Sequence, residues 1–298
     1  MSRSASRTEE SMSKQASYRA ITDALVNELE GGDVPVWLCP WNRAVSGIPA
    51  NLATGRTYSG LNVLVLWSAI SRVGFATNAW MTLKQANELG GRVRRGERGT
   101  RIIGYFDRNA SSSDRDDDRE RERRLVCART FVVFNREQID GLDDAQETGT
   151  NATTDVDRWL ASRGASIVHR GTRAFYAPDA DRITMPSRAR FADHAAYRAT
   201  LIHELIHWTG HRDRLARTFG RSRNEPAYAR EELVAEIGAA FLCAEFDVRG
   251  DLRHAGYLKF WLRELRAQPS MLASVAGAAS RAVKFLHAQD AQAAALAS

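Results

Sequence analysis

Two histidines and a glutamate in one short segment, Leu201 to Trp208, have the spacing of a metal site. The segment contains the pattern H-E-x-x-H, in which His203 and His207 are four residues apart and Glu204 follows the first histidine. On a helix, residues at this spacing lie on one face, one turn apart, so both imidazoles can bind a single cation. Nitrogen ligands favour zinc. Glu204 would then reach a water bound to that cation and act as the general base that activates it.

The flanking residues predict that this segment is a helix, and the helix is expected to be largely buried because of its apolar residues Leu201, Ile202, Leu205 and Ile206. Asp193 is suited to cap the start of a helix, residues 195–206 contain no glycine or proline, and Gly210 is suited to end it. The alternative is that the histidines lie on a polar face without a ligand. A chain with seven histidines produces the pattern by accident in roughly one case in a hundred, and buried His and Glu side chains need a partner.

A third protein ligand is expected from a second predicted helix, residues 230–242. There, Glu232 and Glu236 are also four residues apart and share a face. Two stacked carboxylates on an otherwise apolar helix repel each other unless a cation lies beside them. One could bind the metal ion while the other holds a ligating histidine through its second ring nitrogen. The alternative is an acidic stripe exposed to solvent.

The two segments together resemble the gluzincin branch of metallopeptidases, which includes thermolysin. In that branch the ligating glutamate is followed four residues later by an aspartate that supports a histidine. The resemblance implies that Glu232 is the third ligand and Glu236 the supporting residue, although glutamate stands where aspartate is usual. The metzincin pattern would need a histidine at the position of Asp213, which remains an alternative ligand because aspartate can bind zinc. His211 is expected to lie nearby in a supporting role.

The length and composition bound the remaining possibilities. A chain of 298 residues with 44% hydrophobic content is expected to form two domains, each with a hydrophobic core. Its net charge of +6 is compatible with an anionic partner. The three scattered cysteines indicate reduced thiols. We expect a cytoplasmic protein without a membrane partner, because the first fifteen residues lack an apolar signal core and no apolar run is long enough to span a bilayer.

The first predicted domain, residues 13–142, mixes helices and strands. Helices are expected at 14–30, 61–71 and 83–89, and strands at 93–106 and 125–134. Residues 108–124 contain no apolar side chain except Ala110, so we predict a mobile insertion there. A linker is predicted at 143–153.

This first domain is more basic than the whole chain. Between Trp41 and Phe106, nine lysines and arginines oppose two acids, a net of +7, and five of the arginines lie between positions 92 and 101. Arginines neutralise phosphates and aromatic rings stack on unpaired bases, which together suit single-stranded nucleic acid. The alternative is a solvated basic hairpin. The residues predicted to contact nucleic acid are Trp41, Arg56, Tyr58, Trp80, Lys84, Arg92, Arg94, Arg95 and Arg98.

Several motifs resemble ArdC-type plasmid antirestriction proteins. Residues 54–62 (TGRTYSGLN), 80–85 (WMTLKQ) and 90–99 (GGRVRRGERG) are similar to the N-terminal domain of that family. Residues 203–211 (HELIHWTGH) and 230–236 (REELVAE) are similar to its metallopeptidase-like domain. The resemblance implies that the first domain binds single-stranded DNA, that the second has a zincin-like fold, and that the protein protects incoming plasmid DNA from host restriction during conjugation.

The second predicted domain, residues 154–290, fits a zincin plan: a mostly helical unit with a small sheet. Strands are expected at 166–170 and within 174–185, and helices at 252–265 and 271–286 close the fold. Arg182 to Met185 is predicted to be the edge strand to which an extended peptide adds. Tyr257 or His254 could stabilise an oxyanion, although a structural role is the better interpretation of each. The fold class is therefore α+β with two domains.

Two functions remain open from the sequence. In the first, the protein is a metal-dependent peptidase brought to DNA, with a host restriction-modification protein as a candidate substrate. In the second, it shields single-stranded DNA without proteolysis, and the metal site is structural. Glu204 favours the first function because a structural site has no use for a general base, whereas the size of the basic domain favours the second. The expected cofactor is one divalent ion, Zn²⁺ by preference and Mn²⁺ as the alternative.

Overall fold

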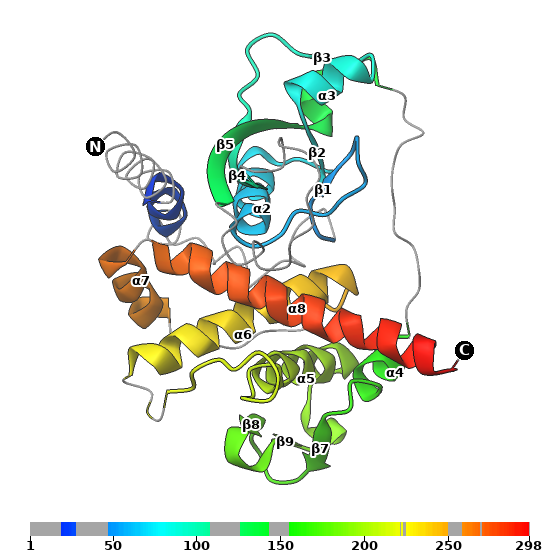
Figure 1. Ribbon diagram of the computed structural model, residues 1–298, viewed down its shortest axis with the longest axis vertical. Coiled ribbons are helices and arrows are strands. Elements are labelled where there is room, and N and C mark those ends of the chain that lie inside the picture. Colours follow the sequence, from blue (N-terminus) through cyan, green and yellow to red (C-terminus); the bar gives the residue numbers. More distant parts are fainter. Residues whose placement is uncertain are drawn as a thin grey trace, which may run out of the picture.

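The computed structural model of the chain has an α+β architecture in two parts, as predicted (Figure 1). It describes residues 19–27, 47–107, 126–142, 155–220, 222, 225–249, 258–268 and 270–297. The predicted insertion at 108–124 and the predicted linker at 143–153 lie outside the described residues, as do Trp41, His254 and Tyr257.

The N-terminal part is built on a four-stranded sheet in the order β1-β2-β5-β4. Its bounds are β1 Ala50–Asn51, β2 Ala79–Thr82, β4 Thr100–Asp107 and β5 Val126–Asn135. Strands β4 and β5 are antiparallel, with Thr100 opposite Val133 and Asp107 opposite Val126. This long pairing confirms the two strands that the apolar runs predicted on either side of the insertion.

Two helices and a small second sheet complete this part. Helix α2 (Leu61–Val73) packs against β4, and helix α3 (Leu83–Glu88) follows β2 directly. Thr82 and Gln85 form a reciprocal capping box at the start of α3, which satisfies backbone donors of the first turn. Strand β3 (Arg92–Val93) pairs with β6 (Ile139–Asp140) in antiparallel fashion.

The C-terminal part contains helix α4 (Val156–Ala161) and a three-stranded sheet in the order β7-β9-β8. Its bounds are β7 Ser166–His169, β8 Phe175–Ala177 and β9 Arg182–Met185. Strand β9 is central, parallel to β7 and antiparallel to β8. The prediction that Arg182–Met185 is an edge strand is therefore wrong, because both of its edges are paired; β8 forms one edge of the sheet.

Four further helices follow this sheet in the chain, and the first of them packs against β8 and β9: α5 His194–Trp208, α6 Pro226–Glu245, α7 Leu258–Ala267 and α8 Ser270–Ala297. The side chain of Asp193 accepts a hydrogen bond from the Ala196 amide at 2.7 Å and so caps α5, as expected. Helix α5 ends at Trp208, just before the predicted stop at Gly210. Helix α8 is longer than the expected 271–286.

The two parts share one continuous hydrophobic core. Helix α8 crosses between the N-terminal sheet and helix α6 (Figure 1). Trp67 of α2 packs edge-on against Phe241 of α6 with ring centroids 5.7 Å apart. The Gly60 amide donates to Ser280 Oγ of α8 at 2.7 Å. The described residues therefore form two sequence units whose apolar surfaces bury each other.

Trp67→Ala tests this shared core. Trp67 is 1% exposed, and replacing a buried tryptophan by alanine typically costs about 3–5 kcal/mol. We expect that loss in the free energy of unfolding, measured by urea denaturation. Val73→Ala, on the same helix but 58% exposed, is the matched control and should change stability little. A Trp67→Ala protein as stable as the control would contradict the interpretation.

Candidate metal centre

The site depends on the close approach of α5 and α6. Gly238 of α6 faces Ile206 of α5, and a Cβ at Gly238 would meet the Ile206 side chain at 2.9 Å. Because glycine leaves this space free, Ile206 packs directly against the backbone of α6. The two helices are therefore close enough for a side chain on α6 to reach the histidines on α5.

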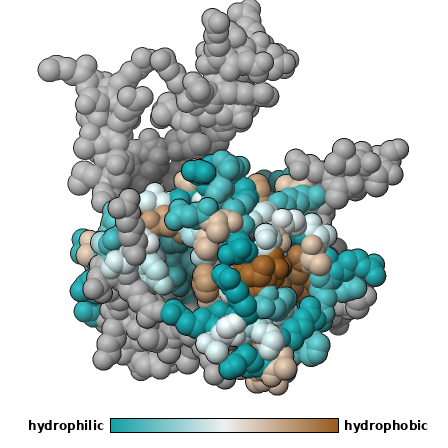
Figure 2. All heavy atoms as spheres, turned by 90° about the horizontal axis from the view of Figure 1, so that it is seen from below, coloured by the Kyte–Doolittle hydropathy of each residue, from teal (hydrophilic) through white to brown (hydrophobic). Residues whose placement is uncertain are grey.

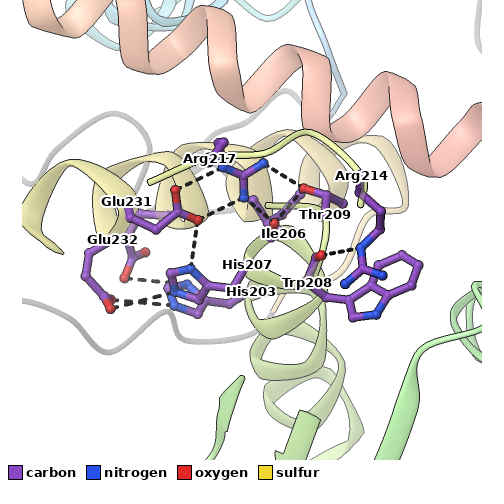
Figure 3. A network of polar contacts seen from close by, with 10 residues as sticks. His203, Ile206, His207, Trp208, Thr209, Arg214, Arg217, Glu231 and Glu232 are labelled. Atoms are coloured by element: carbon purple, nitrogen blue, oxygen red, sulfur yellow. Dashed lines mark hydrogen bonds and ion pairs between the residues drawn. The ribbon is translucent and has the colours of Figure 1, made fainter. Parts of the chain in front are cut away.

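His203, His207 and Glu232 converge at this helix pair (Figure 3). Glu232 Oε2 lies 3.8 Å from His203 Nε2, and Glu232 Oε1 lies 3.7 Å from His207 Nε2. One ligand atom from each residue lies within 4.8 Å of the others. Ligands about 2.1 Å from a tetrahedral zinc ion lie roughly 3.4 Å apart, so these residues fit a divalent cation with little adjustment.

Glu204 also lies at this site, although it is not one of the three candidate metal ligands. It is 6% exposed and lines the cleft that His203, His207 and Glu232 also line. Three protein ligands leave a coordination position open, which is typical of catalytic zinc sites. A carboxylate beside an open position can accept a proton from water.

Of the two residues predicted to support the ligands, Glu236 lies beside His203, whereas His211 lies beside Asp213. Glu236 is fully buried, and its Oε1 lies 3.9 Å from His203 Nδ1. His211 faces Asp213 instead: its Nδ1 accepts a hydrogen bond from the Asp213 amide at 3.3 Å. The Asp213 side chain is 76% exposed. Within the described ranges, the group of candidate ligands includes neither His211 nor Asp213, so the structure offers no support for the metzincin-like alternative.

Sequence reasoning missed Glu231. Its Oε1 lies 3.1 Å from His207 Nδ1, the ring nitrogen that faces away from Glu232. Arg217 donates to both carboxylate oxygens of Glu231 at 2.9 Å. The only available signal was a second acid directly before the candidate ligand. Adjacent helical residues point about 100° apart, so Glu231 and Glu232 reach different nitrogens of one imidazole.

The electrostatics of the site follow from these buried charges. Burial alone lowers the pKa of His207, but the hydrogen bond with Glu231 and the charges of Glu232, Glu231 and Glu204 outweigh burial and raise that pKa to about 9. Burial raises the pKa of Glu231, yet its bonds to His207 and Arg217 prevail and lower it. A cation that binds His207 therefore displaces a proton.

A cleft of about 1100 Å³ opens onto these residues. It is lined by β8, the residues that precede α5, α5 itself and the start of α6. Phe175 of β8 is 43% exposed on its wall. The face of the molecule seen from the side of the small sheet shows hydrophobic residues at its centre with hydrophilic ones around them (Figure 2). A cleft of this size is large enough to hold a ligand against the candidate metal site.

The predicted nucleic-acid contacts are not all available at the surface. Trp80 is 0% exposed and packs edge-on against Phe75 at 5.6 Å. Its prediction as a stacking residue is wrong because the ring lies in the core. Tyr58 is half-buried, and burial raises its pKa despite a hydrogen bond from Asn51.

The basic residues divide into paired and unpaired ones. Arg94 is held by Glu97 at 2.7 Å and by Asp140 at 3.4 Å, and exposed Lys84 lies 3.6 Å from Glu88. The others are exposed, and in the part of the chain that the structure describes none has a carboxylate partner: Arg56, Arg92, Arg95 and Arg98. Four of the nine predicted contacts thus keep a free positive charge for a phosphate.

The fold and the site together define a zincin-like metallopeptidase domain joined to a second, N-terminal domain. Residues 154–279 match the family of zincin-like metallopeptidases, and residues 15–134 match the N-terminal domain of the anti-restriction factor ArdC. The structure is similar to crystal structures of the antirestriction ArdC protein from plasmid R388, with 36% identity. The metal-free form has a TM-score of 0.77 over 92% of this chain and 98% of that chain. The Mn(II)-bound form has a TM-score of 0.76 over 91% and 97%. The chain belongs to the ArdC antirestriction family.

Two further relatives align with most of this chain. Protein y4eC of Sinorhizobium fredii (strain NBRC 101917 / NGR234) is 33% identical over 286 residues, 93% of each chain. DNA primase TraC of Escherichia coli is 35% identical over 277 residues, which are 86% of this chain but 19% of the primase. The Mn(II)-bound relative and the zincin-like fold support a divalent metal here. In the described portion of the chain, no helix has the length and apolar character needed to cross a membrane.

His203→Ala tests the metal centre. Removal of one of two imidazole ligands should abolish tight binding of a divalent ion, because two remaining ligands cannot hold it. Elemental analysis after dialysis against Zn²⁺ or Mn²⁺ should show about one ion per chain in the wild type and none in the variant. His211→Ala is the control, since His211 is a buried histidine just beyond the same helix and outside the ligand group. Loss of metal from both variants would contradict the assignment.

Proposed function

We propose that the protein is a metal-dependent peptidase whose ligands are His203, His207 and Glu232 and whose general base is Glu204. The observation that carries the proposal is the convergence of the three ligand side chains on one point within a cleft that Glu204 also lines. A purely structural site is usually closed by four protein ligands. Zn²⁺ is the proposed ion, with Mn²⁺ as the alternative.

Each residue of the site has a separate role in the proposed hydrolysis of a peptide bond. A divalent cation held by the three ligands would polarise a water molecule and the carbonyl of a peptide bond. Glu204 takes the proton of the attacking water and returns it to the leaving amine. Glu236, whose Oε1 lies 3.9 Å from His203 Nδ1, would support that ring from its far side.

The small sheet supplies a binding surface for an extended peptide. Strand β8 is an edge of the sheet and lines the cleft. An unpaired strand edge offers backbone amides and carbonyls to a peptide that adds as a further strand. The peptide-binding role expected for β9 is therefore proposed for β8.

Glu204→Gln separates catalysis from metal binding. Glutamine keeps the size of the side chain but cannot accept the proton, so hydrolysis of an unfolded protein substrate should fall by at least about 100-fold. Metal content by elemental analysis should stay at the wild-type value. If both proteins cleave equally, Glu204 is not the base. If the wild type cleaves no candidate restriction subunit or unfolded protein, the non-proteolytic alternative with a structural metal site is preferred.

We further propose that the N-terminal domain, residues 13–142, binds single-stranded DNA. The support is the group of exposed arginines without carboxylate partners, Arg56, Arg92, Arg95 and Arg98. Two of them, Arg95 and Arg98, lie in the turn between β3 and β4. Exposed guanidinium groups at a loop tip can follow a flexible phosphate backbone. Trp80 takes no part in stacking.

The double variant Arg95→Ala, Arg98→Ala tests the DNA surface. It should weaken binding of a single-stranded oligonucleotide and lower the slope of log K against log salt by about 0.7 for each phosphate that is no longer neutralised. Fluorescence anisotropy titrations at several salt concentrations measure both quantities. Arg170→Ala, Arg212→Ala removes the same charge from exposed positions in the C-terminal part and serves as control. Equal effects of the two variants would show that only net charge matters.

The two activities fit one biological role. The family of the chain and the two proposed activities support protection of incoming plasmid DNA from host restriction during conjugation, in the cytoplasm of the recipient. A host restriction-modification protein bound to that DNA is the proposed peptidase substrate. Survival of antirestriction activity in the Glu204→Gln protein would assign protection to DNA shielding.

A further inference from the structure

We infer that Glu231, clamped by Arg217, is the positioning residue that orients His207 toward the metal. The inference rests on the proposed metal site. It concerns a buried carboxylate that neither the H-E-x-x-H pattern nor the four-residue spacing of Glu232 and Glu236 includes.

Glu231 has the geometry of a support and not of a ligand. Its Oε1 lies 3.1 Å from His207 Nδ1, while Glu232 Oε1 lies 3.7 Å from His207 Nε2. The two glutamates therefore approach opposite nitrogens of the same ring (Figure 3). An anionic acceptor on Nδ1 fixes the proton there, which leaves the Nε2 lone pair to face the metal and makes it a better donor.

Arg217 fixes Glu231 in that position. Its Nε donates to Glu231 Oε2 and its Nη2 to Glu231 Oε1, each at 2.9 Å. This forked arrangement holds the plane of the carboxylate as a single ammonium group could not. Because both oxygens of Glu231 are engaged, the carboxylate is held away from the position that Glu232 occupies.

Arg217 is itself anchored to α5. It donates to the Ile206 carbonyl at 2.6 Å and to Thr209 Oγ1 at 2.8 Å. The Arg217 side chain is 12% exposed and the Glu231 side chain 6% exposed. One buried guanidinium thus joins the end of α5, which carries His207, to the start of α6, which carries both glutamates.

A second arginine in the same loop provides an internal comparison. Arg214, also 12% exposed, donates to the Trp208 carbonyl at 2.6 Å and pairs with Asp181 at the turn between β8 and β9. Arg214 and Arg217 therefore tie the same loop to the same helix end, each with a carboxylate partner. Only the partner of Arg217 touches a proposed metal ligand.

The experiment compares two isosteric changes, Glu231→Gln and Asp181→Asn. Each removes the charge from the carboxylate that holds one loop arginine, and asparagine tolerates the left-handed backbone of Asp181, whose φ is 44°. The Zn²⁺ affinity of the full chain is measured by competition with a chromophoric chelator. Removal of a group that supports a metal-bound histidine typically costs 10–100-fold in affinity, so Glu231→Gln should bind Zn²⁺ about 10–100-fold more weakly, and Asp181→Asn as tightly as the wild type.

Two further readouts separate positioning from stability. The visible absorption of the Co²⁺-loaded protein reports ligand geometry and should change in Glu231→Gln but not in Asp181→Asn. Arg217→Lys keeps the charge and loses the fork, so it should lower Zn²⁺ affinity by less than Glu231→Gln does; it also serves if Glu231→Gln does not fold. Wild-type affinity and spectra in Glu231→Gln and Arg217→Lys would overturn the inference. A wild-type chain that binds no Zn²⁺, Mn²⁺ or Co²⁺ would instead overturn the proposed function.

Discussion

The packing of α5 directly on α6 is the constraint on which the rest of the structure depends. Each helix alone carries polar side chains in an apolar sequence, which is unfavourable in a protein interior. Packing of Ile206 on the backbone at Gly238 brings the two polar groups together, so that histidines on one helix face carboxylates on the other. A larger residue at position 238 would separate the helices and disperse the site.

Helix α6 also connects the site to the N-terminal part. Its first turns carry Glu231, Glu232 and Glu236, while Phe241, further along the same helix, packs on Trp67 of α2. Because a helix moves largely as a rigid element, a displacement of α2 that shifts α6 would also change the positions of these three carboxylates. The continuous core therefore explains why the two parts can act as one structural unit although their sequence patterns are so different.

The sequence predicted what depends on local spacing and missed what depends on tertiary packing. Helical periodicity put His203 and His207 on one face of their helix. It put Glu232 and Glu236 together on a second helix, and only the resemblance to gluzincins singled out Glu232, which the structure places beside both histidines. Asp193 was found because capping is local. The order of the small sheet was not predictable, since the alternation of strands does not tell which strand lies in the middle. Trp80 looked available for stacking because a short strand in a basic region gives no sign that its ring is covered by Phe75.

The charge balance of the site argues that a cation belongs to it. Glu204, Glu231 and Glu236 are each at most 6% exposed, and the Glu232 side chain is 13% exposed. Arg217 pairs with Glu231. Carboxylates gathered away from water are costly unless cations compensate them. Protonation of His207, whose pKa is raised to about 9, supplies one positive charge, and a divalent ion would supply two while leaving both imidazoles neutral. The same carboxylates that raise the pKa of the histidine are therefore those that favour a metal ion in place of its proton.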